Sequence, residues 1–513
     1  MGFALLAVFV IPAISIPFVY LTGKKSPKAA ALFVALIAIV NLILVLSTVP
    51  AVLSNPDHRY VESYNWISAI MGSTFTLFSD GISVSIALIS LVLILAASLF
   101  SITYMAKKEH LAAYYALLCM LSVGLVGVFL TSNLILFYFC WELMLIPTYF
   151  IVGEWGYKDA YKQAFKLFLY THAGAVFVLL SIGAIYRVTG TTDMFVARDS
   201  LVSLALPDVA KWLLIALTGG FAVKMAVVPV HMWLPDAHSE APAPMSALLS
   251  GVIISAGAYA ILRLSLGMVF PAVGLTFGTD FLHALAVVGV LSAFFGALIA
   301  LVSTDIKRLI AYSSIAHMGY VMFGLSLFPA NVATGVVVVL ASTTAITGTV
   351  LHIISHALSK GLLFLAAGGV MHQTDERDIR KMGGLANKIP FTALSSTIAS
   401  LSIAGVPPFA CFMSELLIFV GASQIMYVDQ FYLVPTFLML VATVISLAYM
   451  IRFTLKVFLG ESRSEISEGK DLKKTVVISR WMKLSFVILI VLIIVLGIYP
   501  TFFIDLIQTV QLG

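Results

Sequence analysis

Uninterrupted apolar runs of about twenty residues recur along the whole chain, and they restrict its fold more than any other feature. A helix of that length spans the hydrocarbon core of a bilayer, whereas a membrane β-barrel is built from shorter segments in which apolar and polar residues alternate. Because 61% of the 513 residues are hydrophobic and only 10% are charged, the chain cannot cover itself with a water-soluble surface. The sequence therefore predicts an all-α polytopic membrane protein with about fourteen transmembrane helices.

The runs group into four segments. Residues 1–110 hold the first three runs, with an extracytoplasmic hairpin expected at 51–80, where apolar residues alternate among turn-forming ones. Residues 111–266 and residues 281–458 each hold a large set of helices, and residues 481–511 form a C-terminal helix. We expect these segments to be the structural units of the chain.

The distribution of basic residues predicts the orientation in the membrane, since Lys and Arg concentrate in cytoplasmic loops. Placing the N-terminus outside assigns most of the 29 Lys and Arg to the inner side. Four fall outside: Arg59, Arg187, Arg198 and Lys211. We expect a multi-pass protein of the plasma (inner) membrane with both termini extracytoplasmic. The net charge of +5 follows from this topology and does not indicate binding to nucleic acid.

Four charged side chains lie near the middle of apolar runs: Glu142, Lys224, Lys360 and Glu415. Each costs about 2.5–3.5 kcal/mol at the bilayer centre unless it is paired or hydrated. Glu142 and Lys224 lie at one depth, and a buried ion pair adds little stability, so we interpret them as a proton gate. Lys166 and Arg263 lie near helix ends and are expected to snorkel to the interface.

Two of the runs contain prolines that break a helix. Pro229 follows Lys224 in the seventh run, and Pro407 and Pro408 precede Glu415 in the twelfth. Discontinuous helices in corresponding halves of a chain are typical of inverted-repeat transporters. The carbonyls freed near Pro229 or Pro407, together with a carboxylate, would also suit sodium, so the transported ion stays open.

Six histidines fall in or beside the same runs: His172, His231, His238, His317, His352 and His356. A lone buried histidine is more often a core residue, but His352, His356 and Lys360 stand at i, i+4 and i+8 on one helix face. As a set they are typical of a proton relay, because imidazole donates and accepts protons near neutral pH. That helix has no acidic or cysteine partner, so we predict no metal site.

The three cysteines, Cys119, Cys140 and Cys411, are too far apart in the sequence to indicate zinc or an iron–sulfur cluster. No redox active site and no cofactor are therefore expected in this chain. Any iron–sulfur clusters or other redox centres should belong to partner subunits.

Five motifs resemble one known family. They are FCWELMLIPTYF around Glu142, KMAVVPVHMWLPDAHSEAP from Lys224, TDIKRLIAYSSIAHMGY at 304–320, HALSKGLLFLAAG from His356, and MSELLIF around Glu415. They resemble the antiporter-like subunits of the respiratory complex I superfamily, of the subunit M (subunit 4) type. Mrp sodium/proton antiporter subunits and subunits of membrane-bound hydrogenases and sulfur reductases are related to that type.

The resemblance implies fourteen helices with two inverted five-helix repeats, here 111–266 and 281–458, each forming a half-channel. It also implies that Glu142 and Lys224 gate protons, that His317 and His356 relay them, and that Glu415 lies near the exit. One departure is Ser255, which stands where the family usually has a lysine in the eighth helix. Because serine cannot carry a proton charge, either Lys360, His352, His356 or water replaces the central relay, or the path is interrupted.

These observations predict an ion-translocating subunit of a complex I-type oxidoreductase of the NADH:quinone oxidoreductase kind. Its expected partners are the lipid bilayer, other antiporter-like and small membrane subunits, and a peripheral redox arm. Three alternatives remain: a subunit of a hydrogenase or sulfur reductase with Mrp-like exchange, a structural subunit that has lost transport, and a free-standing transporter. The last is disfavoured, because the polar residues form a chain instead of converging on one pocket.

Overall fold

A computed structural model of the chain describes residues 2–67, 73–329, 336–461 and 478–510. Three predicted features lie partly outside the described residues: the hairpin at 68–72, the eleventh apolar run at 330–335, and basic residues of the inner face at 462–477. Within the described ranges, twelve helical segments are long and apolar enough to cross a membrane. An all-α polytopic fold is therefore confirmed.

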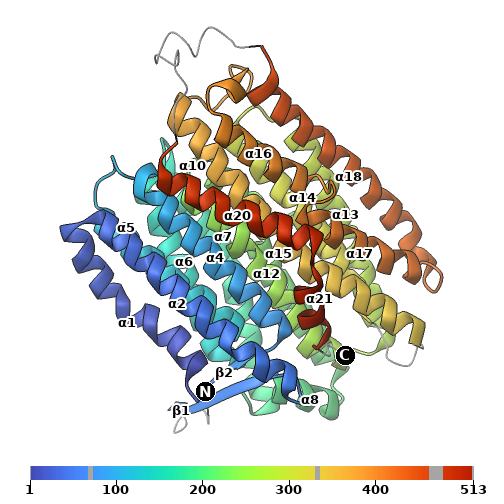
Figure 1. The fold of residues 1–513 in the computed structure, drawn as a ribbon. Helices are drawn as coiled ribbons and strands as arrows, with labels where there is room; N and C mark the ends of the chain where they lie inside the picture. The colour runs from blue at the N-terminus through green and yellow to red at the C-terminus, as the bar shows by residue number, and fades with distance from the viewer. Residues whose placement is uncertain (1, 68–72, 330–335, 462–477, 511–513) are drawn as a thin grey trace.

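Eleven of these segments contain or consist of one long α-helix. They are α1 (Ala4–Lys25), α2 (Pro27–Ser54), α4 (Gly81–Tyr104), α5 (Leu111–Leu130), α6 (Leu134–Trp155), α7 (Ala160–Thr189), α13 (Leu275–Val302), α14 (Ile306–Ser326), α15 (Val336–Thr374), α18 (Leu433–Thr454) and α20 (Arg480–Ile498). The twelfth, Ala243–Ala272, is a continuous series of short helices that includes α11 (Ala243–Leu248) and α12 (Ile254–Ala260). Figure 1 shows the long helices side by side, with both termini at the end of the bundle that carries the hairpin and α8 (Met194–Leu204).

Two further candidate crossings each consist of two helices with a non-helical segment between them. Helix α9 (Pro207–Met225) and α10 (Leu234–Glu240) are separated by a non-helical segment that contains Pro229. Helix α16 (Pro390–Ile403) and α17 (Ala410–Ile425) are separated by residues 404–409, which contain Pro407 and Pro408. Proline has no backbone N–H and clashes with the preceding turn, which explains both interruptions. If each pair crosses once, the total is fourteen, and that count and the inverted repeats stay predictions.

The extramembrane segment is a two-stranded antiparallel sheet of β1 (Tyr60–Ile67) and β2 (Ser73–Ser79), and it begins later than predicted, because α2 continues to Ser54. Glu62 of β1 accepts hydrogen bonds from the backbone of Leu5 (3.1 Å) and Leu6 (2.9 Å). A carboxylate is stabilised at a helix N-terminus by the helix dipole. Burial and a hydrogen bond to Glu62 raise the pKa of Tyr60 to about 12, so this hydroxyl donates at neutral pH. The sheet thereby holds the start of α1.

The predicted behaviour of Arg263 is wrong. Its guanidinium does not snorkel but pairs with Asp80 at 2.7 Å, and the two side chains are only 5% and 1% exposed. Lys166 stays 31% exposed and pairs with Asp236 at 2.8 Å. The partner of Arg263 is the residue before α4, which is distant in sequence, so the spacing of charges along single runs could not indicate it.

Replacing Asn133 with alanine should destabilise the junction between the sheet and the bundle. Its side chain caps α6 by accepting from Ile135 N and Leu136 N, and it donates to Ser73 (2.7 Å) and Thr192 (3.0 Å). Loss of the cap and of buried partners should lower stability by about 2–4 kcal/mol. The midpoint of thermal denaturation of the purified complex measures this. The exposed Asn55→Ala is the control, and an equal effect of both variants would contradict the expectation.

Candidate functional site

The predicted ion-path residues fall into two groups on different helices. The first group is Glu142 of α6 and Lys224 of α9. The second group is His317 of α14, His352, His356 and Lys360 of α15, and Glu415 of α17. Helix α12, which carries Ser255, packs on α9 and also contacts α14 and α15. The helix that carries Ser255 therefore lies between the two groups.

Lys224 is held by the tryptophan next to Glu142 and not by Glu142 itself. Its ammonium donates to the carbonyl of Trp141 at 3.0 Å and lies 3.8 Å from the centre of the Trp141 ring. Consecutive residues on a helix point about 100° apart, so Trp141 faces inward while Glu142 faces α7. There the Glu142 carboxylate contacts His172 Nδ1 at 3.1 Å. Lys224 is 3% exposed, whereas the Glu142 side chain is 23% exposed.

No direct salt bridge between Glu142 and Lys224 is present in the described structure, although the two lie within electrostatic range. A small cavity of about 10 Å³ adjoins Lys224 and is lined by the hydroxyl-bearing Thr148 and Thr171. Both hydroxyls donate to carbonyls of their own helices, which leaves their lone pairs open to a donor. The space is about the size of one water molecule.

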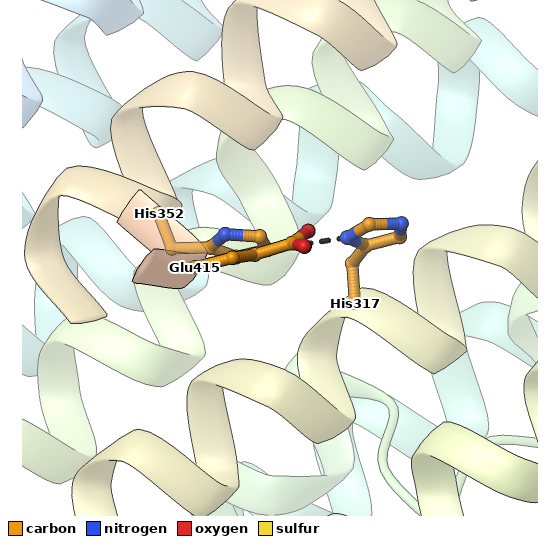
Figure 2. A group of neighbouring side chains, drawn as sticks. All are labelled: His317, His352 and Glu415. Carbon is orange, nitrogen blue, oxygen red and sulfur yellow. Dashed lines mark hydrogen bonds between the residues drawn. The ribbon is translucent and has the colours of Figure 1, made fainter. Parts of the chain in front are cut away.

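The second group brings three helices together around two imidazoles. His317 Nδ1 and His352 Nε2 are 3.2 Å apart, and their rings are nearly parallel. Figure 2 shows the Glu415 carboxylate beside the His352 ring, pointing towards His317. One ligand atom of each of the three side chains lies within 4.8 Å of the others. The acidic partner that α15 lacks is therefore supplied by α17.

The hydrogen bonds assign the protons on these rings. The Ser414 hydroxyl donates to the carbonyl of Cys411 (2.8 Å), so it must accept from His352 Nδ1, 3.0 Å away. In neutral His352, Nε2 then carries no proton, so it accepts a hydrogen bond from His317 Nδ1–H. The other nitrogen of His317 lies 3.5 Å from the Tyr449 hydroxyl. The result is a directed chain of hydrogen bonds through two buried imidazoles.

Lys360 continues this line along α15 and is completely buried. Its ammonium donates to the carbonyl of Ile310 at 3.2 Å and to the hydroxyl of Ser313. His356 stands between Lys360 and His352, and neither of its nitrogens has a partner among the described residues. Buried polar groups of this kind are usually satisfied by water. The face of α15 that carries His352, His356 and Lys360 is therefore suited to a relay in which water molecules take part.

Two further buried basic residues lie near this line: Lys307, which the sequence did not single out as a path residue, and His238, one of the six histidines named above. Lys307 is one of the basic residues counted on the inner side, and it lies in the first turn of α14, fully buried, where it donates to the carbonyl of Ala241. His238 is fully buried against Phe364, with no described partner for either nitrogen, and lies within electrostatic range of Lys307 and Lys360. Asp305 caps α14, so Lys307 is the second residue of that helix, and only the packing of α14 in the bundle shows that its side chain is buried.

His231 and Ser255 do not join either group directly. His231 lies in the break between α9 and α10, packs edge-on against Phe295 with ring centres 4.7 Å apart, and has one unpartnered nitrogen. The Ser255 hydroxyl donates to the carbonyl of Gly251 in its own helix at 2.9 Å. Because α12 carries neither lysine nor histidine, the two groups are separated by a helix without a basic relay side chain.

Two curated relatives cover nearly the whole chain. NADH-quinone oxidoreductase subunit M of Rickettsia conorii is 32% identical over 96% of this chain and 94% of the relative. The subunit M of Rhodobacter capsulatus is 34% identical over 91% of this chain and 86% of the relative. The family model for NADH:quinone oxidoreductase/Mrp antiporter transmembrane segments matches residues 131–446.

Three solved structures share the fold. A chain of respiratory complex I from Thermus thermophilus has a TM-score of 0.82 at 20% identity, over 98% of this chain and 97% of that one. A chain of the Mrp complex from a Dietzia species has a TM-score of 0.81 at 20% identity, over 99% and 97%. A chain of an archaeal membrane-bound sulfane sulfur reductase has a TM-score of 0.81 at 26% identity, over 98% and 76%. The chain is thus an antiporter-like membrane subunit of a multisubunit complex and belongs to the NADH:quinone oxidoreductase/Mrp antiporter family.

Proposed function

We propose that this subunit translocates protons across the plasma (inner) membrane, with both termini extracytoplasmic, and that electron transfer in partner subunits drives it. The partners are other antiporter-like and small membrane subunits and a peripheral redox arm that holds iron–sulfur clusters and other redox centres. The observation that carries the proposal is the buried line of Lys360, His356, His352 and His317 that leads to Glu415. No packing requirement explains so many ionisable groups away from water.

In this proposal, residues 111–266 and 281–458 act as two half-channels. His317 Nδ1–H donates to His352 Nε2, and the hydroxyls of Ser414 and Tyr449 continue the chain at either end. A proton that arrives on one ring leaves from its other nitrogen, since imidazole exchanges protons at both positions. In the first half, a change in the distance between Glu142 and Lys224 alters how firmly the lysine holds its proton.

Sodium is the second candidate ion for one half of the chain. Glu415 lies directly beside the interrupted segment 404–409, where Gly405 approaches its carboxylate. Backbone carbonyls freed by a helix break, together with a carboxylate, are oxygen ligands that suit sodium. The similarity to a sulfane sulfur reductase chain also leaves open a complex of that kind.

Replacing Lys224 with alanine should lower ion uptake about tenfold or more, because the only described ammonium of the first group is removed. The measurement is uptake by proteoliposomes that contain the intact complex, driven by its electron donor, with proton and sodium signals followed separately. Lys211→Ala, which changes a partly exposed lysine of the same helix, is the control. Unchanged uptake with normal assembly would support a structural subunit, and a surviving sodium signal would identify sodium as the ion.

A further inference from the structure

We propose that His317, His352 and Glu415 form a binding site for a divalent transition-metal ion of the zinc class. The three side chains come from α14, α15 and α17 and converge in Figure 2. They are buried, with exposed fractions of 0%, 0% and 7%. Two imidazole nitrogens and one carboxylate oxygen are a common ligand set for zinc sites that keep a fourth position for water.

The spacing of the two imidazole nitrogens fits such an ion. Zn–N bonds of about 2.0–2.1 Å place two nitrogens about 3.3 Å apart across a tetrahedral angle. His317 Nδ1 and His352 Nε2 are 3.2 Å apart, so their spacing already matches that of two nitrogens bound to one zinc ion, and rotation of the side chains can aim both at it. The Glu415 carboxylate accepts no hydrogen bond from the described residues, and a change in its torsions brings an oxygen to the ion.

The partners of the outer nitrogens favour metal binding at the inner ones. Metal-bound histidines usually donate their second N–H to an oxygen, which fixes the tautomer and the ring orientation. Ser414 already accepts from His352 Nδ1 at 3.0 Å. Tyr449 lies 3.5 Å from His317 Nε2, and that nitrogen takes the proton when Nδ1 turns to the metal. Both rings are thus oriented for one ion before it arrives.

The ligand types also select the class of ion. Imidazole suits zinc, copper, nickel and iron, whereas magnesium and calcium prefer sites made of oxygen atoms. The nearby Lys360 ammonium opposes a divalent cation, and the Glu415 carboxylate offsets that repulsion. An ion between the rings replaces the proton that His317 shares with His352. The expectation that a bound zinc ion blocks proton transfer rests on the proposed function, whereas the binding of zinc itself does not.

The test is zinc binding to the intact purified complex. Wild type, His352→Gln and Glu415→Gln are equilibrated with graded zinc sulfate and desalted, and the bound zinc is measured by mass spectrometry. X-ray absorption at the zinc edge reports the ligands. The matched control is His283→Gln, because His283 and Asp429 form a partly exposed histidine–carboxylate pair (2.7 Å) without a second imidazole.

Wild type and His283→Gln are expected to bind one more zinc ion tightly per complex than His352→Gln or Glu415→Gln. X-ray absorption should show two imidazole ligands on that ion. Ser414→Ala should keep the ligands but bind about 10- to 100-fold more weakly. Equal zinc in wild type and both site variants, or a loss in His283→Gln alone, would overturn the site. Zinc that binds as expected yet leaves ion uptake unchanged supports the site and contradicts the proposed translocation path. If His352→Gln or Glu415→Gln fails to assemble, Ser414→Ala still tests the site, because it leaves all three proposed ligands in place.

Discussion

Replacing Lys360 with methionine is expected to lower ion uptake by about a hundredfold or more while the complex still assembles. The two side chains have similar length and volume, so the exchange removes the charge and leaves the packing of α15 against α14 nearly unchanged. Among the described residues, Lys360 donates to the carbonyl of Ile310 and to the hydroxyl of Ser313, and it forms no salt bridge with any of them. Because both acceptors of the ammonium are neutral, its removal leaves no opposite charge uncompensated among the described residues. A large loss of uptake would therefore report conduction and not folding.

The measurement compares uptake per assembled complex in proteoliposomes, with electron transfer recorded in the same samples. Lys456→Met, which removes an exposed lysine at the end of the α18 segment, is the control. If Lys360→Met conducts as well as wild type, the line of His352, His356 and Lys360 on α15 is not the ion path. If uptake and assembly fall together, Lys360 has a structural role. The double change Lys360→Met/Ser313→Ala, which also removes the hydroxyl that accepts from the lysine, should then restore neither uptake nor assembly.

The architecture was predictable because each of its signals lies within one segment. Apolar runs of membrane length give the crossings, and the prolines give the interruptions between α9 and α10 and between α16 and α17. The identity of the intramembrane ionisable residues follows in the same way. Each of these inferences needs only the residues of one run and the thickness of a bilayer.

The contacts within the site were not predictable, because they join different segments. Glu142 and Lys224 share a depth, but the rotation between Trp141 and Glu142 on α6 decides which of them reaches the lysine. Likewise, the acidic partner of the α15 imidazoles comes from α17, and a search within one helix could not find it.

Breaking the buried pair of Arg263 and Asp80 should have the largest effect on stability. The guanidinium and carboxylate are 2.7 Å apart and almost fully buried, so either single change leaves an uncompensated charge. Both Arg263→Leu and Asp80→Asn should therefore lower stability by about 3–5 kcal/mol. Asparagine is the appropriate change at position 80, because it preserves a side-chain oxygen that accepts from Ser83 N and caps α4.

The double variant Arg263→Leu/Asp80→Asn separates pairing from packing. With both charges gone, most of the lost stability should return, since two neutral groups need no compensation. Some loss should persist, because the guanidinium also lies 5.5 Å from the ring centres of Phe78 and Tyr259. Thermal denaturation of the purified complex and the amount of assembled subunit measure all three variants. Additive losses would mean that the two groups stabilise the bundle independently, and the ion pair would then not be what joins α4 to the segment containing α12.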